Sequence, residues 1–137
     1  MTAGRGVVHS EMFPLVQSDV GNPTELFQIW INLPARDKMV PAHFTMLWSE
    51  TIPEHRFEDE EGRATVVTTV AGALDGRDPP LPPPHSWARR PEAGLAVWTI
   101  RLEADARWQV PAGPPDAQRL LYLFEGDAVA IGGTTVA

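Results

Sequence analysis

The chain has 137 residues, of which 43% are hydrophobic and 21% charged, and it carries a formal net charge of -7. This composition argues against a disordered tail, and no apolar run approaches the roughly 18 residues needed to cross a bilayer. Lys and Arg residues are few and unclustered, so we expect no direct binding to nucleic acid or to an anionic membrane surface.

Short strands separated by glycine and proline are expected throughout the chain. No segment keeps a helical period, and the 14 prolines disfavour long helices. The predicted strands occupy residues 26–33, 63–71, 95–102, 108–110, 120–124 and 128–131, and another begins at 134. The proline-rich residues 79–84 are expected to form an extended crossing loop. This pattern predicts an all-β antiparallel barrel or sandwich.

Turns and chain ends carry further information. The acidic run from Glu58 to Glu61 precedes Gly62 and predicts a solvated turn. Residues 125–127 and 132–133 predict two more turns. Strand-like residues begin soon after Met1 and stop at Ala137 without any covering segment. Complete domains usually cover their strand edges, so both ends are expected to be cut from a longer protein.

Three segments resemble the pirin family of proteins. Residues 1–11, MTAGRGVVHSE, closely resemble the segment that closes the N-terminal cupin of pirins. Residues 26–39, LFQIWINLPARDKM, resemble the family's linker strand and the loop after it. Residues 121–127, LYLFEGD, are similar to the cupin turn in which glutamate and glycine follow a strand. The resemblance spans the chain and is most specific in the first forty residues.

The resemblance implies a cupin-type (jelly-roll) antiparallel barrel, the C-terminal half of a double cupin with a remnant of the first barrel. Residues 1–23 would belong to the N-terminal cupin. Residues 24–137 would form the linker strand and the C-terminal cupin, truncated at its end. Pirins are described as holding one iron through three histidines and one glutamate, and several as quercetin 2,3-dioxygenases. Two of those four ligands match His9 and Glu11 of this chain.

His9 and Glu11 suit a metal site on chemical grounds as well. Residues two apart on a strand project from the same face, so both side chains can converge on one ion. Imidazole and carboxylate are suitable ligands for non-haem Fe(II). On spacing alone, however, the pattern His-x-Glu is common, and two neighbouring polar residues at a strand end are the simpler explanation.

The other histidines are not expected to complete this site. His43, His55 and His85 are predicted to lie in irregular proline-rich or acidic stretches, where they are expected to be solvated or to make one hydrogen bond. The family's His-Pro-His segment, which supplies the other two ligands, is absent. Because two ligands without a shaped cavity compete poorly with water, we expect Fe(II) to bind this chain weakly or not at all.

The predicted function is that of a pirin-like cupin protein. Its intact form would be an iron-dependent dioxygenase of the quercetin 2,3-dioxygenase type with a flavonoid-like substrate, and this chain would be catalytically incomplete. The alternative is a non-catalytic module that binds a protein partner, as implied by the coregulator role described for the animal pirin. The chain has no cysteine, which fits a reducing compartment, so the expected location is the cytoplasm.

Overall fold

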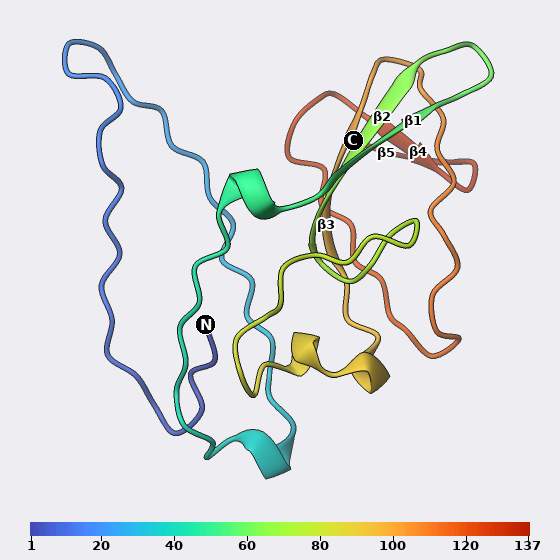
Figure 1. The fold of residues 1–137 in the computed structure, drawn as a ribbon. Coiled ribbons are helices and arrows are strands. Elements are labelled where there is room, and N and C mark those ends of the chain that lie inside the picture. The colour runs from blue at the N-terminus through green and yellow to red at the C-terminus, as the bar shows by residue number, and fades with distance from the viewer.

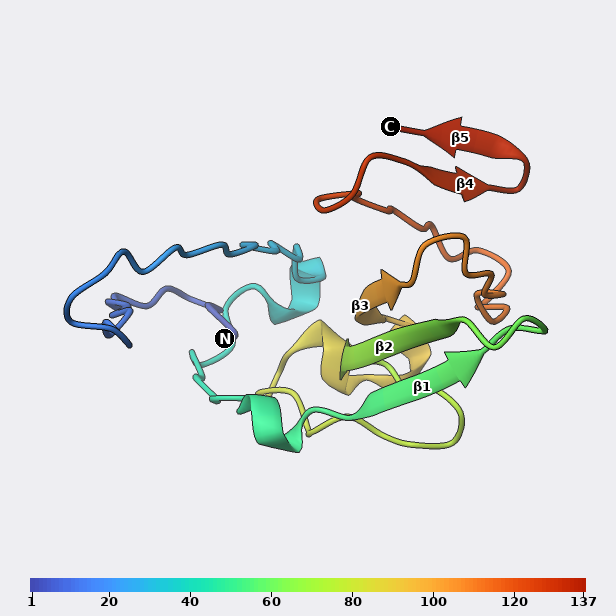
Figure 2. The ribbon, with the colours of Figure 1, turned by 90° about the horizontal axis from the view of Figure 1, so that it is seen from above.

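The computed structural model describes residues 1–137, with five strands and four 3-10 helices (Figure 1). Strands β1 (Glu54–Glu58), β2 (Ala64–Ala71) and β3 (Val97–Leu102) form one antiparallel sheet in that order. Strands β4 (Val129–Ile131) and β5 (Thr134–Val136) form a hairpin, which Figure 2 shows apart from that sheet. The single-turn helices are η1 (Ala35–Asp37), η2 (Ser49–Thr51), η3 (Trp87–Arg89) and η4 (Pro91–Ala93).

Strand β2 is the centre of the small core. Its sequence, ATVVTTVA, consists of Val, Thr and Ala, and β-branched residues favour the pleated conformation. Every second residue is buried, and Val67 and Thr69 are fully inaccessible. The strand is paired on both sides, with Val67 opposite His55 of β1 and Ile100 of β3. Burial on this strand therefore fixes the register of the whole sheet.

An irregularity in the β2–β3 pairing brings the end of β2 against the segment before β3. Thr69 pairs with Trp98 and Ala71 with Val97, so one extra residue bulges out of β2. Gly72 follows at φ +80°, and its carbonyl accepts a hydrogen bond of 3.2 Å from the Trp98 indole N–H. A Cβ atom at Gly72 would lie 2.7 Å from the Cβ of Ala96. Only glycine fits this position without strain.

The β4–β5 hairpin follows directly from its turn sequence. Gly132 and Gly133, both at positive φ, connect Ile131 to Thr134. Positive φ at both central residues is characteristic of the two-residue turn that matches the twist of a hairpin. The predicted strand at 128–131, the turn and the strand beginning at 134 are confirmed.

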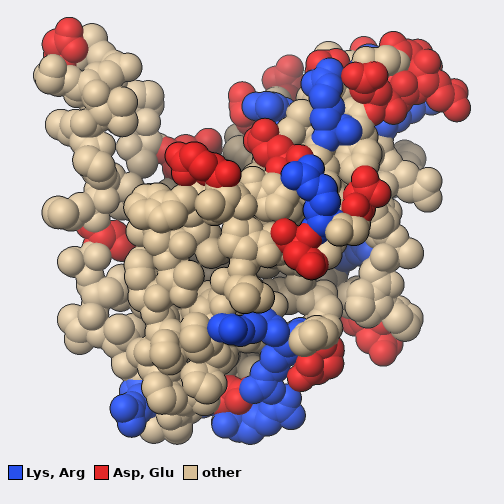
Figure 3. Space-filling view, viewed as in Figure 1, with Lys and Arg blue, Asp and Glu red and all other residues tan.

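Residues 7–33 form an extended segment that we call the N-terminal arm. No backbone–backbone hydrogen bond joins this arm to the rest of the chain. Figures 1 and 2 show it as a long loop that projects away from the sheet. Its surface carries few charges, whereas acidic side chains gather at the β1–β2 end of the sheet (Figure 3). The arm is exposed along nearly its whole length, with only Asn22 and Leu33 partly covered.

Several predicted strands differ from the structure. The strands predicted at 63–71 and 95–102 are confirmed as β2 and β3. Those predicted at 26–33, 108–110 and 120–124 are wrong, because those segments have no hydrogen-bonded neighbour. Strand β1 was not predicted, since three of its five residues are charged and only His55 is buried. The chain forms a strand wherever a partner lies alongside, not wherever the apolar pattern is strongest.

The strand-rich, antiparallel architecture fits the expected all-β class. The two sheets share no closed ring of hydrogen-bonded strands, so a jelly-roll barrel stays a prediction, as does the division at residues 23 and 24. The proline-rich residues 79–84 form an irregular loop, in which Pro83 is buried. No helix is long and apolar enough to span a membrane.

Candidate functional site

A glycine turn at the base of the N-terminal arm precedes the two predicted metal ligands. Thr2 and His43 exchange backbone hydrogen bonds of 2.8 and 2.9 Å, and the Arg5 N–H donates to the Val40 carbonyl at 3.0 Å. Gly4 between them adopts φ +51°, and any Cβ there would collide with the Val40 carbonyl oxygen. The glycine-rich motif therefore anchors residues 2–5, four positions before His9.

His9 and Glu11 lie close together beyond this turn. The His9 Nε2 and Glu11 Oε1 atoms are 3.7 Å apart, and the two side chains are 41% and 52% exposed. The backbone of residues 8–11 pairs with no other segment, so the strand expected to carry the two ligands is not formed. The side chains nevertheless converge as residues two apart on an extended chain do.

The pair suits Fe(II) in the type of its donors but not in their number. One imidazole nitrogen and one carboxylate belong to the ligand set of non-haem iron oxygenases. No group of three or more His, Cys, Asp or Glu side chains in residues 1–137 is placed to hold a metal ion. His9 and Glu11 can thus supply two coordination positions, and a complete site needs ligands that these residues do not provide.

The structure places one of the remaining histidines outside the irregular stretches expected for all three. His55 lies in β1 and is buried, so its expected place in an irregular stretch is wrong, whereas its one polar contact fits the alternative of a single hydrogen bond. Its ring stacks on Phe57, and its Nε2 lies 3.5 Å from the Thr69 hydroxyl. His43 and His85 come together with ring centroids 5.7 Å apart, a proximity that the sequence does not reveal because the two residues are 42 positions apart.

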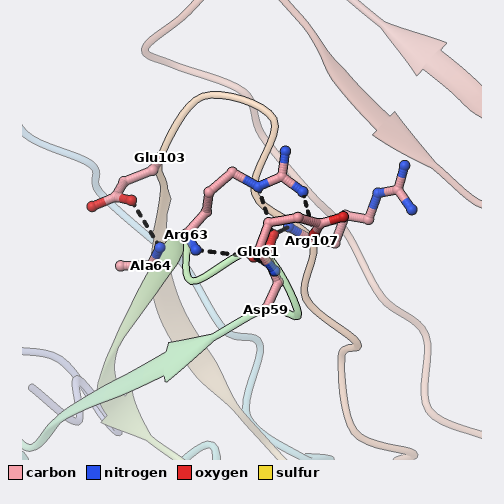
Figure 4. Close-up of polar contacts among 6 residues, drawn as sticks. All are labelled: Asp59, Glu61, Arg63, Ala64, Glu103 and Arg107. Carbon is pink, nitrogen blue, oxygen red and sulfur yellow. Dashed lines mark hydrogen bonds and ion pairs between the residues drawn. The ribbon is translucent and has the colours of Figure 1, made fainter.

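Asp59 organises the acidic turn between β1 and β2 (Figure 4). Its carboxylate accepts hydrogen bonds from the backbone N–H groups of Glu61, Arg63 and Arg107, and from the Arg63 guanidinium at 2.9 Å. Its side chain is only 6% exposed. The solvated turn predicted for this acidic run is therefore wrong for Asp59, although Glu60 and Glu61 are exposed.

The turn sequence contains a signal that could have identified Asp59. Aspartate is favoured at the first position of a tight turn and glycine at the fourth. Asp59 and Gly62 occupy those positions, and the Gly62 N–H donates to the Asp59 carbonyl at 2.9 Å. A second carboxylate, that of Glu103, accepts the Ala64 N–H at 2.8 Å beside the same turn. Both carboxylates hold backbone in place, which indicates a structural role.

The environment of Asp59 shifts its acidity. Partial burial alone would raise the pKa of Asp59, but the hydrogen bonds from Arg63, Arg107 and Glu61 outweigh burial, and the pKa lies below 3.8. Because the pKa of Asp59 is lower in the folded chain than in the unfolded chain, the ionised carboxylate stabilises the fold at pH values above the unfolded-state pKa. This stabilisation is lost as the pH falls through the folded-state pKa.

We expect Asp59→Asn to remove this pH-dependent stabilisation. At neutral pH the variant should unfold at lower urea concentration than the native chain, because asparagine has no negative charge and replaces one of the two accepting oxygens by an NH2 group, which cannot accept a hydrogen bond. The difference should shrink as the pH is lowered from neutral through the folded-state pKa of Asp59, which lies below the ordinary value for an aspartate. Urea unfolding across this range measures the effect, with the exposed Glu60→Gln as control. A difference that is independent of pH would contradict the assignment.

Two surface depressions lie over the sheet, and neither includes His9 or Glu11. One is lined by residues of all three strands, among them Arg56, Val66 and Arg101. The other lies beside the acidic turn, where Phe57 and Trp108 pack with ring centroids 5.5 Å apart. The candidate metal ligands thus lie on the open arm, away from both depressions.

A strand-rich protein with antiparallel sheets, glycine turns and a His–Glu pair after one such turn fits the cupin class. No family model matches the chain, and no solved structure matches it. Several curated proteins, in contrast, match most of the chain. A Vibrio cholerae protein, provisionally named a quercetin 2,3-dioxygenase, is 32% identical over 92% of this chain and 40% of its own length. A Pseudomonas aeruginosa protein with the same provisional name is 33% identical over 96% and 42%.

Human pirin is 43% identical over 96% of this chain and 47% of its own length. The chain belongs to the pirin family and is a pirin-like cupin protein, which confirms the resemblance noted in the sequence. It spans about two fifths of the length of the first two bacterial relatives. Activities, substrates and partners of a whole pirin are therefore matters of proposal for this chain.

Proposed function

We propose that the whole protein is an iron-dependent dioxygenase of the quercetin 2,3-dioxygenase type, in which His9 and Glu11 are two of the metal ligands. The observation that carries this proposal is the His9–Glu11 pair, 3.7 Å apart and beginning three positions after Gly6 of the anchored glycine turn. The provisional names of the two bacterial relatives support a dioxygenase over the alternative of a non-catalytic binding module.

The chain's own residues would have distinct roles at such a site. His9 would donate a ring nitrogen, and Glu11 a carboxylate oxygen whose negative charge favours a divalent cation. Gly4 and the Arg5–Val40 hydrogen bond would hold the segment in position. Bound Fe(II) would supply the redox chemistry needed to activate oxygen. Because both ligands are about half exposed, further ligands and a covering wall are needed to exclude water.

The finer architecture belongs to the same proposal. We place residues 1–23 with an N-terminal cupin barrel and residues 24–137 with a second, C-terminal jelly-roll barrel. The exposed arm supports this division, because His9 and Glu11 have no wall of their own chain around them. A flavonoid-like compound is the proposed substrate class, and the cytoplasm is the proposed location because the chain lacks cysteine.

A chimaera tests the proposed activity. In it, this chain replaces the matching segment of the Pseudomonas aeruginosa relative, which supplies the remainder of a whole pirin-type protein. We expect the chimaera to retain iron by elemental analysis and to consume quercetin and oxygen. His9→Ala and Glu11→Gln should each lower iron content by roughly tenfold or more, since loss of even an indirect ligand contact costs 10–100-fold.

The outcome distinguishes the metal ligands from other histidines. His85→Ala, which changes an exposed histidine outside the arm, should retain iron and activity. A chimaera that keeps its iron after Glu11→Gln, or loses it equally after His85→Ala, would sink the assignment of His9 and Glu11.

A further inference from the structure

His43 and His85 form a pair of imidazole rings that the proposed iron site does not use. Their ring centroids lie 5.7 Å apart, and their ring planes are inclined by 45°. His9 and His55 are the only histidines whose ring nitrogens have a polar partner within the chain. Because a neutral imidazole keeps one nitrogen that accepts, the pair presents two nitrogen lone pairs that no group of this chain occupies.

Thr2 connects the two loops that carry these histidines. Its backbone exchanges hydrogen bonds of 2.8 and 2.9 Å with the backbone of His43. Its hydroxyl donates to the carbonyl of Pro84, the residue before His85, at 2.9 Å. Thr2 itself is buried, with 3% of its surface exposed. One buried residue thus holds the backbone at both histidines, so contacts within this chain bring the two rings together.

The backbone of His85 adopts an unusual conformation. Its φ of +61° lies in the left-handed region, which residues other than glycine rarely adopt. His85 is the third residue of a tight turn, which the Ser86 N–H closes by donating to the Pro83 carbonyl at 3.0 Å. Glycine or asparagine is the usual residue where this position requires a positive φ. Histidine therefore carries a conformational cost here, and such local strain is concentrated at functional sites.

The spacing of the two rings suits two ligands of one metal ion. A Zn–N bond of about 2.0–2.1 Å places the centroid of an imidazole about 3 Å from the ion, so two rings on one tetrahedral ion lie roughly 5 Å apart. The observed separation of 5.7 Å differs from this spacing by less than about 1 Å. Rotation of the side chains supplies the difference, since His85 is exposed and His43 is half-buried.

The donor atoms determine which metals the pair would bind. Imidazole nitrogens suit Zn(II), Cu(II) and Ni(II), and a given nitrogen site binds Fe(II) more weakly than any of these three. The imidazole–carboxylate pair of His9 and Glu11 therefore remains the expected place for Fe(II). The two histidine pairs differ in chemistry and are expected to select different ions.

We propose that His43 and His85 bind one divalent transition-metal ion of the Zn(II) type through one nitrogen of each ring, with water in the remaining positions. The ion would link two loops whose histidines are 42 positions apart. Because only the folded chain brings these histidines together, metal binding would stabilise the fold. This site is separate from the iron site proposed at His9 and Glu11 and does not depend on it.

A chain without the His9–Glu11 pair provides the test. The double variant His9→Ala with Glu11→Gln removes that pair as a binding place, and calorimetric titration should still show one Zn(II) per chain. His43→Asn and His85→Asn, each added to the double variant, should weaken Zn(II) binding at least about tenfold, since loss of even an indirect ligand contact costs roughly 10–100-fold. Asparagine tolerates the left-handed conformation, so it preserves the turn at position 85.

Thermal unfolding gives an independent readout. Saturating Zn(II) should raise the unfolding midpoint of the double variant, because the ion binds the folded chain. His85→Asn should remove this shift without lowering the midpoint in metal-free buffer, which separates loss of the ligand from loss of the fold. The exposed Glu60→Gln is the control and should leave the shift unchanged.

Three results would overturn the proposal: no Zn(II) binding by the double variant, binding that survives both His43→Asn and His85→Asn, or sedimentation showing that Zn(II) joins two chains. Because His9 and Glu11 are already replaced in these experiments, their outcome is independent of iron binding at that pair.

Discussion

Replacing Arg90 by leucine is expected to lower the free energy of unfolding by about 3 kcal/mol, because it leaves a buried carboxylate without its partner. The Arg90 Nη2 atom donates to Asp37 Oδ1 at 2.7 Å, and the Asp37 side chain is only 9% exposed. The other carboxylate oxygen, Oδ2, has no hydrogen-bond partner. We expect the low end of the usual range of 3–5 kcal/mol, since Arg90 itself is 27% exposed.

The unpaired charge of Asp37 is the expected cause of the lower stability of Arg90→Leu, and two further variants test this cause. Asp37→Ala combined with Arg90→Leu removes both charges, so the double variant should recover much of the loss in urea unfolding. Arg36→Ala is the matched arginine control. Its Nε lies 3.6 Å from Asp37 Oδ2, but its side chain is 69% exposed, so at most about 1 kcal/mol is expected. Equal losses for Arg36→Ala and Arg90→Leu would contradict this account.

Gly72→Ala is expected to cost about 3 kcal/mol, because backbone strain and a steric clash act together. Gly72 adopts φ +80°, and the new Cβ would lie 2.7 Å from Ala96 Cβ and 2.9 Å from the Leu95 carbonyl oxygen. Two of the three close atoms belong to backbone, which cannot rotate aside. The substitution should therefore displace the segment before β3 and weaken the bond between the Trp98 indole and the Gly72 carbonyl.

Gly62→Ala separates the two contributions. Gly62 has nearly the same φ, +76°, but a Cβ there would meet nothing within 4 Å. This control should show only the strain of the left-handed conformation, about 1–2 kcal/mol. Urea unfolding of the two variants gives the difference, and Trp98 fluorescence should change for Gly72→Ala alone. Identical losses for both glycines would show that crowding against Ala96 has no effect.

The features that the sequence predicted correctly are those determined locally. Strand β2 is rich in Val and Thr and is bounded by glycines at 62 and 72, so its position follows from propensity and turn residues alone. The β4–β5 hairpin follows from Gly132 and Gly133. The glycine motif before His9 could also be recognised in the sequence. The close approach of Gly4 to Val40 explains why a glycine is needed there.

The features that the sequence missed depend on distant partners. Residues 26–33 and 120–124 have strand-like patterns, but a pattern becomes a strand only when another chain segment lies alongside. Arg90 and Asp37 are 53 positions apart, and nothing near either residue predicts their ion pair. His43 and His85 likewise meet where Thr2 binds both loops, through the His43 backbone and the Pro84 carbonyl.

The most direct test of the metal assignment is a titration of the isotope-labelled chain with Fe(II) under anaerobic conditions, followed by NMR. Paramagnetic Fe(II) broadens the signals of the nuclei closest to it, even when binding is weak. We expect the amides of His9, Ser10 and Glu11 to broaden first, and Glu11→Gln to abolish that effect. If broadening is strongest at His43 and His85, or is unchanged in Glu11→Gln, His9 and Glu11 do not bind the metal.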